Sequence, residues 1–201
     1  TVEGTYDSSG KLQTQIEEGL GADVFFSAAK KQMNALVDED LIDPNSVVEL
    51  LENQIVLIVP AGSGAGLASF EDIANVETVA IGDPESVPAG QYGKEALESL
   101  GLWDAVFAKA SLGTNVTEVL NWVAEGSADA GIVYATDAAQ MPDKVEVVAA
   151  APEGSLAAKV IYPVGILTAS QQRETADAFL TFLQSQAALD IFTAAGFVIN
   201  V

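Results

Sequence analysis

Short apolar runs alternate with amphipathic stretches along the whole chain. Runs of strand length cover 23–26, 54–60, 78–81, 130–134, 145–149 and 160–167. Helical spacing and capping residues predict helices over about 11–18, 29–37, 89–100, 102–107, 115–126, 136–140, 171–183 and 186–194. Residues 1–6 are expected to form a further short strand, and the Gly/Ser-rich segment 61–68 a mobile loop. Strands that alternate with helices are typical of an α/β fold with largely parallel sheets.

Two long apolar strands bracket the middle of the chain, at 54–60 and 160–168. The chain is therefore expected to leave one lobe, build a second lobe and return to the first. Lobe one is predicted to comprise 1–54 and 165–201, and lobe two 55–164. Two lobes joined by two β crossings imply a cleft that closes around a ligand by a hinge motion.

Composition narrows the chemistry available to the protein. The net charge is −21, and the eight lysines and arginines are scattered, so nucleic acid and anionic lipid are repelled at long range. Histidine and cysteine are absent, which excludes disulfides, thiol nucleophiles and Ser–His–Asp catalysis. No paired-carboxylate motif stands out, so we expect neither an enzyme nor a cation bound by protein ligands. No apolar run approaches the roughly 20 residues of a membrane helix, and the start lacks a signal-peptide pattern, so any export signal has been removed.

The segment 82–97 contains the most informative local pattern. An apolar strand at 78–81 runs into a turn with two prolines, and a helix opens at Ala89-Gly90. Small side chains there let a ligand approach the main chain closely. A helix start also offers unpaired N–H groups to an anion. The alternative is an ordinary strand–loop–helix connection.

Two further helix starts and one tyrosine join this pattern. Ser8-Ser9 and Asn115-Val116 each begin a predicted helix, with Glu118 at capping-box spacing from Asn115. Three helix starts could point at one anion, which neutral donors would satisfy without a positive side chain. Tyr134 closes the strand 130–134, where its phenol could donate to a ligand oxygen. The alternatives are plain helix caps and a half-buried tyrosine at the rim.

Four stretches carry a family resemblance over essentially the whole chain: 8–28, 82–97, 131–138 and 182–197. They include Gly-Asp-Pro-Glu-Ser-Val-Pro-Ala-Gly-Gln-Tyr from Gly82 and Gly-Ile-Val-Tyr from Gly131. In this combination and order, the motifs resemble the periplasmic molybdate-binding proteins of bacterial ABC transporters. That family has the type II, two-lobed fold of solute-binding proteins, with two mainly parallel sheets flanked by helices.

The resemblance implies a ligand, a site and a partner. The ligand is molybdate or tungstate, with no cofactor. The family's oxyanion donors fall on the hydroxyl of Ser9, the main chain of Ala89 and Val116, and the hydroxyl of Tyr134. The protein would pass the ion to a membrane permease, from the periplasm or from a tether outside the membrane. The alternatives are another tetrahedral oxyanion, such as sulfate or phosphate, and the ligand-sensing domain of a regulator.

The start of the chain departs from the family pattern. Members usually begin with about thirty further residues, the size of a strand–turn–helix unit, including a second ligand serine. Lobe one is therefore expected to lack a central strand, and the chain to bind oxyanion weakly unless that segment is restored. An unpaired sheet edge is a liability. The protein is expected to be a monomer unless strand exchange between copies compensates.

Overall fold

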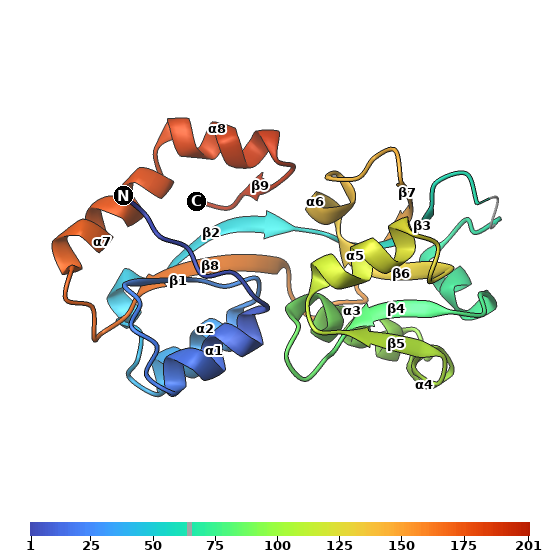
Figure 1. Cartoon of the computed structure of the whole chain (residues 1–201), viewed down its shortest axis with the longest axis horizontal. Coiled ribbons are helices and arrows are strands. Elements are labelled where there is room, and N and C mark those ends of the chain that lie inside the picture. The colour runs from blue at the N-terminus through green and yellow to red at the C-terminus, as the bar shows by residue number, and fades with distance from the viewer. Residues whose placement is uncertain (64–65) are drawn as a thin grey trace. The chain divides into compact units, whose positions relative to one another are not determined.

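A computed structural model describes residues 1–63 and 66–201 of the chain (Figure 1). Residues 64–65, part of the loop expected at 61–68, lie outside the described residues. The chain divides into two compact units, Thr1–Glu52 with Val160–Val201, and Asn53–Lys159. The sequence places the second crossing at 164/165, whereas the division falls at 159/160. The reason is that the strand from Val160 pairs with strands of the first unit.

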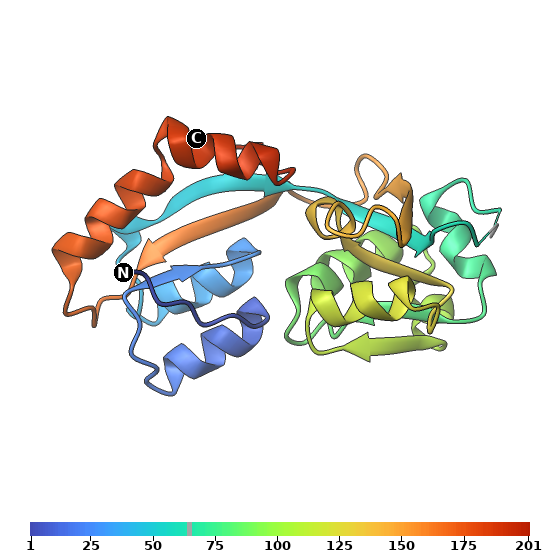
Figure 2. The same ribbon diagram turned by 45° about the horizontal axis from the view of Figure 1, so that its top comes forward.

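The first unit contains a four-stranded sheet in the order β1-β8-β2-β9. Its elements are α1 (Ser9–Glu17), β1 (Val24–Phe26), α2 (Lys30–Asp38), η1 (Pro44–Ser46), β2 (Val48–Asn53), β8 (Val160–Ile166), α7 (Arg173–Leu183), α8 (Gln186–Ala194) and β9 (Val198–Ile199). Strand β1 runs antiparallel to β8, and β9 runs antiparallel to β2. Figure 2 shows α1 and α2 on one side of this sheet and α7 and α8 on the other.

Alternating side chains of β8 divide the core of the first unit into two layers. Val164 and Ile166 pack with residues of α7. Between them, Gly165 lies against Met33 of α2 and Ile42. This alternation is what a strand covered on both faces requires.

The strand expected at residues 1–6 is absent. This segment is exposed and has no regular structure before the start of α1. A strand needs a neighbour to satisfy its main-chain groups, and among the described strands β1 pairs only with β8. The prediction for residues 1–6 was therefore wrong.

The second unit contains a five-stranded sheet in the order β5-β4-β6-β3-β7. Its elements are β3 (Ile55–Pro60), η2 (Phe70–Asn75), β4 (Val79–Gly82), α3 (Pro88–Ser99), α4 (Trp103–Phe107), β5 (Ala110–Gly113), α5 (Val116–Ala124), β6 (Ala130–Tyr134), α6 (Ala135–Ala138) and β7 (Val145–Ala150). Strand β4 is parallel to β5 and β6, whereas β3 is antiparallel to β6 and β7.

The expectation of mainly parallel sheets therefore holds only for β4, β5 and β6. Helix α3 and then α4 separate β4 from β5, and α5 separates β5 from β6, which is what parallel neighbours need. Strand β3 follows directly from the first unit and lies between β6 and β7, antiparallel to both. The general prediction of an α/β fold, with sheets flanked by helices, is confirmed.

Helices cover both faces of the central strands in the second unit. Gly131 of β6 lies against Val123 of α5, while the next residue, Ile132, lies against Gly93 of α3. Consecutive strand residues point to opposite faces, so α3 and α5 lie on opposite sides of the sheet. This arrangement explains why β4 and β6 are apolar and buried throughout. Over residues 1–63 and 66–201, no helix has the length and apolar character needed to span a bilayer.

Candidate functional site

Three helices of the second unit begin at the same edge of its sheet. Strands β4 and β5 are in parallel register, with Gly82 beside Gly113, and Ala80 of β4 lies beside Gly131 of β6. Their carboxyl ends therefore meet at one edge. Helix α3 follows β4, α5 follows β5 and α6 follows β6. Ligands of α/β sheets commonly bind at such an edge.

The first turn of α3 leaves two main-chain donors unused. Pro88 at the first helical position has no N–H, and Gln91 N donates to Val87 O at 3.0 Å. Neither Ala89 N nor Gly90 N has an acceptor among the described residues. Both residues are buried, so these amides have little access to water. Buried amides without an acceptor are costly, and an anion at the helix start would satisfy them.

The start of α3 is held tightly against β4 by a glycine. A methyl group on Gly90 would overlap the carbonyl oxygen of Gly82. Only a residue without a side chain lets the helix begin so close to the end of the strand. Gly90 therefore fixes where the Ala89 amide points.

The first turn of α5 has a side-chain cap and, like α3, main-chain amides without an acceptor in the described structure. Asn115 Oδ1 accepts the N–H of Glu118 at 2.9 Å, as the capping spacing predicts. The Glu118 carboxylate accepts the N–H of Thr114 at 2.7 Å, one residue earlier than a capping box would give. In the described part of the chain, no acceptor takes the N–H of Val116 or Thr117.

Tyr134 ends β6 and is 2% exposed. It is therefore not the half-buried rim residue that the sequence left as an alternative. Its main-chain N–H donates to Asp137 Oδ2 at 3.1 Å, and Asp137 lies in the first turn of α6. Burial raises the pKa of Asp137 to about 6, and the hydrogen bond from Tyr134 opposes part of that rise.

Ser9 lies in the first unit, as the first residue of α1, and is 5% exposed. The N–H of Ala28 donates to Ser9 Oγ at 2.9 Å. The hydroxyl accepts here, so its own proton remains available to a ligand. The neighbouring Ser8 hydroxyl is buried and has no hydrogen-bond partner in the described structure.

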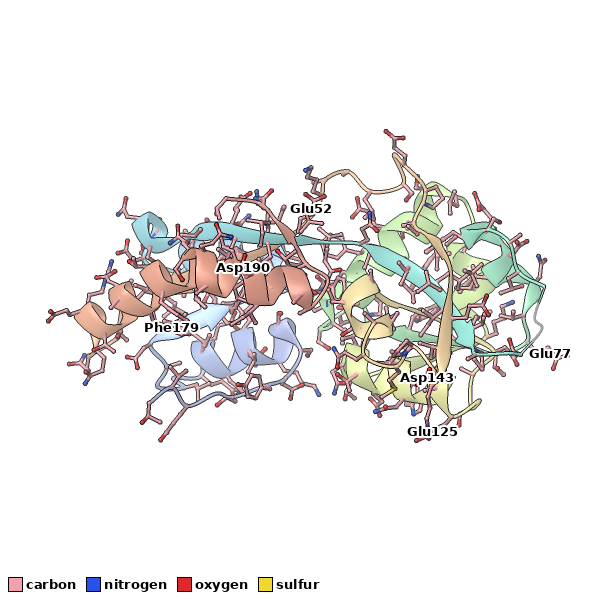
Figure 3. All side chains as sticks on the ribbon, turned by 90° about the horizontal axis from the view of Figure 1, so that it is seen from above. Glu52, Glu77, Glu125, Asp143, Phe179 and Asp190 are labelled. Carbon is pink, nitrogen blue, oxygen red and sulfur yellow. The ribbon has the colours of Figure 1, made fainter. Side chains whose placement is uncertain are left out.

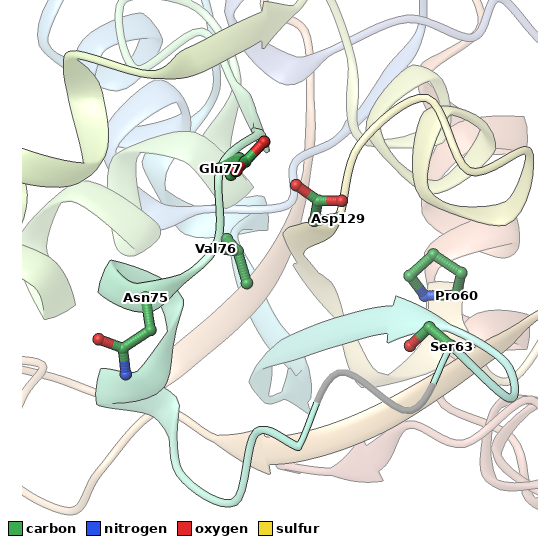
Figure 4. Close-up of a pocket in the computed structure, with 6 residues that line it drawn as sticks. All are labelled: Pro60, Ser63, Asn75, Val76, Glu77 and Asp129. Carbon is green, nitrogen blue, oxygen red and sulfur yellow. The ribbon is translucent and has the colours of Figure 1, made fainter.

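A depression in the second unit lies at the other end of the sheet. Its volume is about 310 Å³, and its lining residues are Pro60, Ser63, Asn75, Val76, Glu77 and Asp129 (Figure 4). Val76 and Glu77 precede β4, and Asp129 precedes β6, so they lie at the amino ends of these strands. The Asp129 carboxylate is occupied by the N–H and hydroxyl of Thr78 at 2.8 and 2.7 Å. These bonds lower the pKa of Asp129. The depression lies at the opposite end of the strands from the helix starts.

The candidate donors are neutral, while the surface is acidic. Figure 3 shows acidic side chains spread over both units, among them Asp190 in the first and Glu77 and Asp143 in the second. Helix starts supply the positive potential that an anion needs in such a protein. Within residues 1–63 and 66–201, no group of three or more His, Cys, Asp or Glu residues could hold a metal ion.

Comparisons with known proteins show the class of this protein. Residues 1–198 match the family of bacterial extracellular solute-binding proteins, and the chain belongs to that family. It is 44% identical to the Bacillus subtilis protein YvgL, named as an ABC transporter substrate-binding lipoprotein, over 98% of this chain and 75% of that protein. It is 38% identical to the molybdate-binding protein ModA of Escherichia coli, over 99% of this chain and 79% of that protein.

A solved structure supports the same fold. The periplasmic molybdate-binding protein of Azotobacter vinelandii has a TM-score of 0.83 and 24% identity, over 98% of this chain and 87% of that one. The family membership that the four sequence stretches indicate is thereby confirmed. Members of this class bind a solute and carry out no reaction on it, as the sequence predicts.

Next to the candidate donors, sequence reasoning missed Asp137, and it named Gly90 only as a small residue that lets a ligand approach. The Asp137 carboxylate accepts a hydrogen bond from the main-chain N–H of Tyr134. Gly90 lies in close contact with the carbonyl group of Gly82 in β4. An acidic residue three positions after the end of a strand was the available signal for Asp137. The contact of Gly90 with β4 had no equivalent signal, because the distance between the helix start and β4 is a tertiary feature.

Proposed function

We propose that this protein is the solute-binding component of an ABC import system and that its ligand is molybdate or tungstate. The observation that carries the proposal is the meeting of α3, α5 and α6 at the carboxyl edge of β5-β4-β6, with amides of Ala89 and Val116 unused in the described structure. The relatives named as molybdate-binding proteins support the choice of ion. The lipoprotein and periplasmic relatives support a place outside the cytoplasmic membrane, next to a permease.

Four groups are proposed to bind the oxyanion, each as a hydrogen-bond donor. They are the Ser9 hydroxyl, the amides of Ala89 and Val116, and the Tyr134 hydroxyl. Hydrogen bonds to a charged partner contribute about 1.5–3 kcal/mol each, so neutral donors can bind an oxyanion without a positive side chain. A protonated phosphate would leave its own O–H without an acceptor among these donors, which disfavours it against fully deprotonated oxyanions.

Thermal unfolding with a series of oxyanions tests the proposal. Molybdate and tungstate are expected to stabilise the protein by about 2.7 kcal/mol at about 100 times the dissociation constant, since a ligand of the folded state shifts the unfolding equilibrium. Sulfate and phosphate at equal concentration are the controls, and calorimetry supplies affinities. A larger shift with sulfate or phosphate, or no shift with any of the four ions, contradicts the proposal.

Replacing the Tyr134 hydroxyl is expected to weaken binding without harming the fold. Tyr134→Phe keeps the buried ring and removes one donor, so the binding free energy should fall by about 1–3 kcal/mol. Titration calorimetry with molybdate measures this loss. Tyr6→Phe is the matched control, because Tyr6 is 92% exposed. An affinity equal to that of the unmodified protein would remove Tyr134 from the site.

A further inference from the structure

A carboxylate of the protein, that of Asp137, lies at the junction of β6 and α6. Asp137 Oδ2 accepts the N–H of Tyr134 at 3.1 Å, as the Glu118 carboxylate accepts the N–H of Thr114 at the start of α5. Asp137 follows Tyr134 by three residues, so its carboxylate lies at the carboxyl end of β6. An edge that is proposed to offer donors to an anion therefore also carries a half-buried carboxylate.

Within residues 1–63 and 66–201, no lysine or arginine forms an ion pair with Asp137. Strands β3 and β6, which pack against α6, contain no acidic or basic side chain. Helix α5 contributes Glu118, which is bonded to Thr114, and β7 contributes Glu146, with Asp143 and Lys144 just before it. Desolvation raises the pKa of Asp137, and the hydrogen bond from the Tyr134 N–H lowers it in part; neither contribution is a nearby charge.

We propose that Asp137 is a positioning residue of the oxyanion site, which holds the Tyr134 main chain in place and takes up a proton when a dianion binds. This inference rests on the proposed function. A protonated carboxyl still accepts a hydrogen bond through its carbonyl oxygen, so proton uptake removes like-charge repulsion without releasing Tyr134. Two like charges in a poorly solvated site repel strongly, and neutralising one of them is the less costly arrangement.

The sign of the pH dependence follows from this coupling. Burial places the pKa of Asp137 at about 6 in the free protein, so the group is mostly ionised at neutral pH. A bound dianion favours the neutral form and raises the pKa further. Binding should therefore take up protons near neutral pH, and the affinity should rise as the pH falls toward 6. Each unit of added pKa shift corresponds to about a tenfold gain in affinity over that range.

Calorimetry with molybdate tests the inference on the unmodified chain. Titrations from about pH 6 to about pH 8, in buffers of different ionisation enthalpy, measure the protons taken up on binding. Proton uptake and tighter binding at the lower pH are expected. Binding that is equally tight at every pH, with the same heat in every buffer, overturns the role of Asp137 but leaves the proposed function intact. Absence of molybdate binding at every pH refutes both.

Three variants separate the charge of Asp137 from its hydrogen bond. Asp137→Asn removes the charge and keeps an acceptor for the Tyr134 N–H, so binding near pH 8 should tighten and proton uptake should vanish. Asp137→Ala also removes the acceptor, so molybdate affinity should fall. Glu146→Gln makes the same charge change at an exposed position of β7 and should leave the pH profile unchanged. If the pH profile of binding by Asp137→Asn is identical to that of the unmodified protein, the inference is contradicted. If this variant fails to fold, the measured proton uptake of the unmodified chain decides whether the inference holds.

Discussion

Gly90→Ala is expected to destabilise the second unit by about 3 kcal/mol and to abolish oxyanion binding, because the added methyl group would overlap a main-chain atom. The overlap is with the carbonyl oxygen of Gly82, which cannot rotate away as a flexible side chain would. Relief requires α3 to move away from the end of β4. That movement would carry the Ala89 amide away from the donor edge, so folding and binding should fail together.

Tryptophan fluorescence during unfolding measures this effect selectively. Both tryptophans, Trp103 and Trp122, belong to the second unit. Gly21→Ala is the matched control, because nothing lies within 4 Å of the position that its methyl group would occupy. We expect the control to unfold like the unmodified protein and to bind molybdate equally well. Normal stability and normal binding of Gly90→Ala would show that the helix start does not depend on this contact.

Ser9→Ala is expected to reduce both the stability of the first unit and the affinity for oxyanion. The folded protein loses the acceptor of the Ala28 N–H, and a buried donor left unsatisfied costs about 1–3 kcal/mol. The proposed ligand contact is lost as well, which should weaken binding by a further 1–3 kcal/mol or so. Circular dichroism during thermal unfolding gives the first effect, and calorimetry with molybdate gives the second.

Ser8→Ala is the control for this change. It removes a buried hydroxyl of the same helix start, but one without a hydrogen-bond partner in the described structure. Its removal should be neutral or slightly stabilising, since no bond is lost. Unchanged molybdate affinity in Ser9→Ala would exclude the Ser9 hydroxyl from the site, even if stability falls as expected.

Much of the fold could be predicted from the sequence because its signals are local. The apolar runs at 54–60 and 130–134 become β3 and β6, and the Asn115 spacing becomes the cap of α5. These elements depend on periodicity and on contacts within a few residues. Strand β2 at Val48–Asn53 was not predicted. The short strands β5 and β9 were missed as well, because two to four residues carry little pattern and need a neighbouring strand to pair with.

The candidate donors could be predicted only as separate helix starts and a strand end. Ala89, Val116 and Tyr134 are far apart in the chain, and only the parallel register of β4 with β5 and β6 brings their elements to one edge. The prediction of a strand at residues 1–6 was wrong because strand formation also depends on distant partners. The local pattern of this segment favours a strand, but in the described structure no neighbour pairs with it.

The sequence by itself determined the class of fold and the resemblance to oxyanion-binding proteins, and it predicted donors of neutral character. Those properties follow from residue types and from their order along the chain. The tertiary structure alone decided which helix starts share an edge, that Gly90 allows α3 to begin against Gly82, and that Asp137 holds the main chain of Tyr134. These features depend on the pairing of distant strands and on burial, which are long-range properties that no local pattern records.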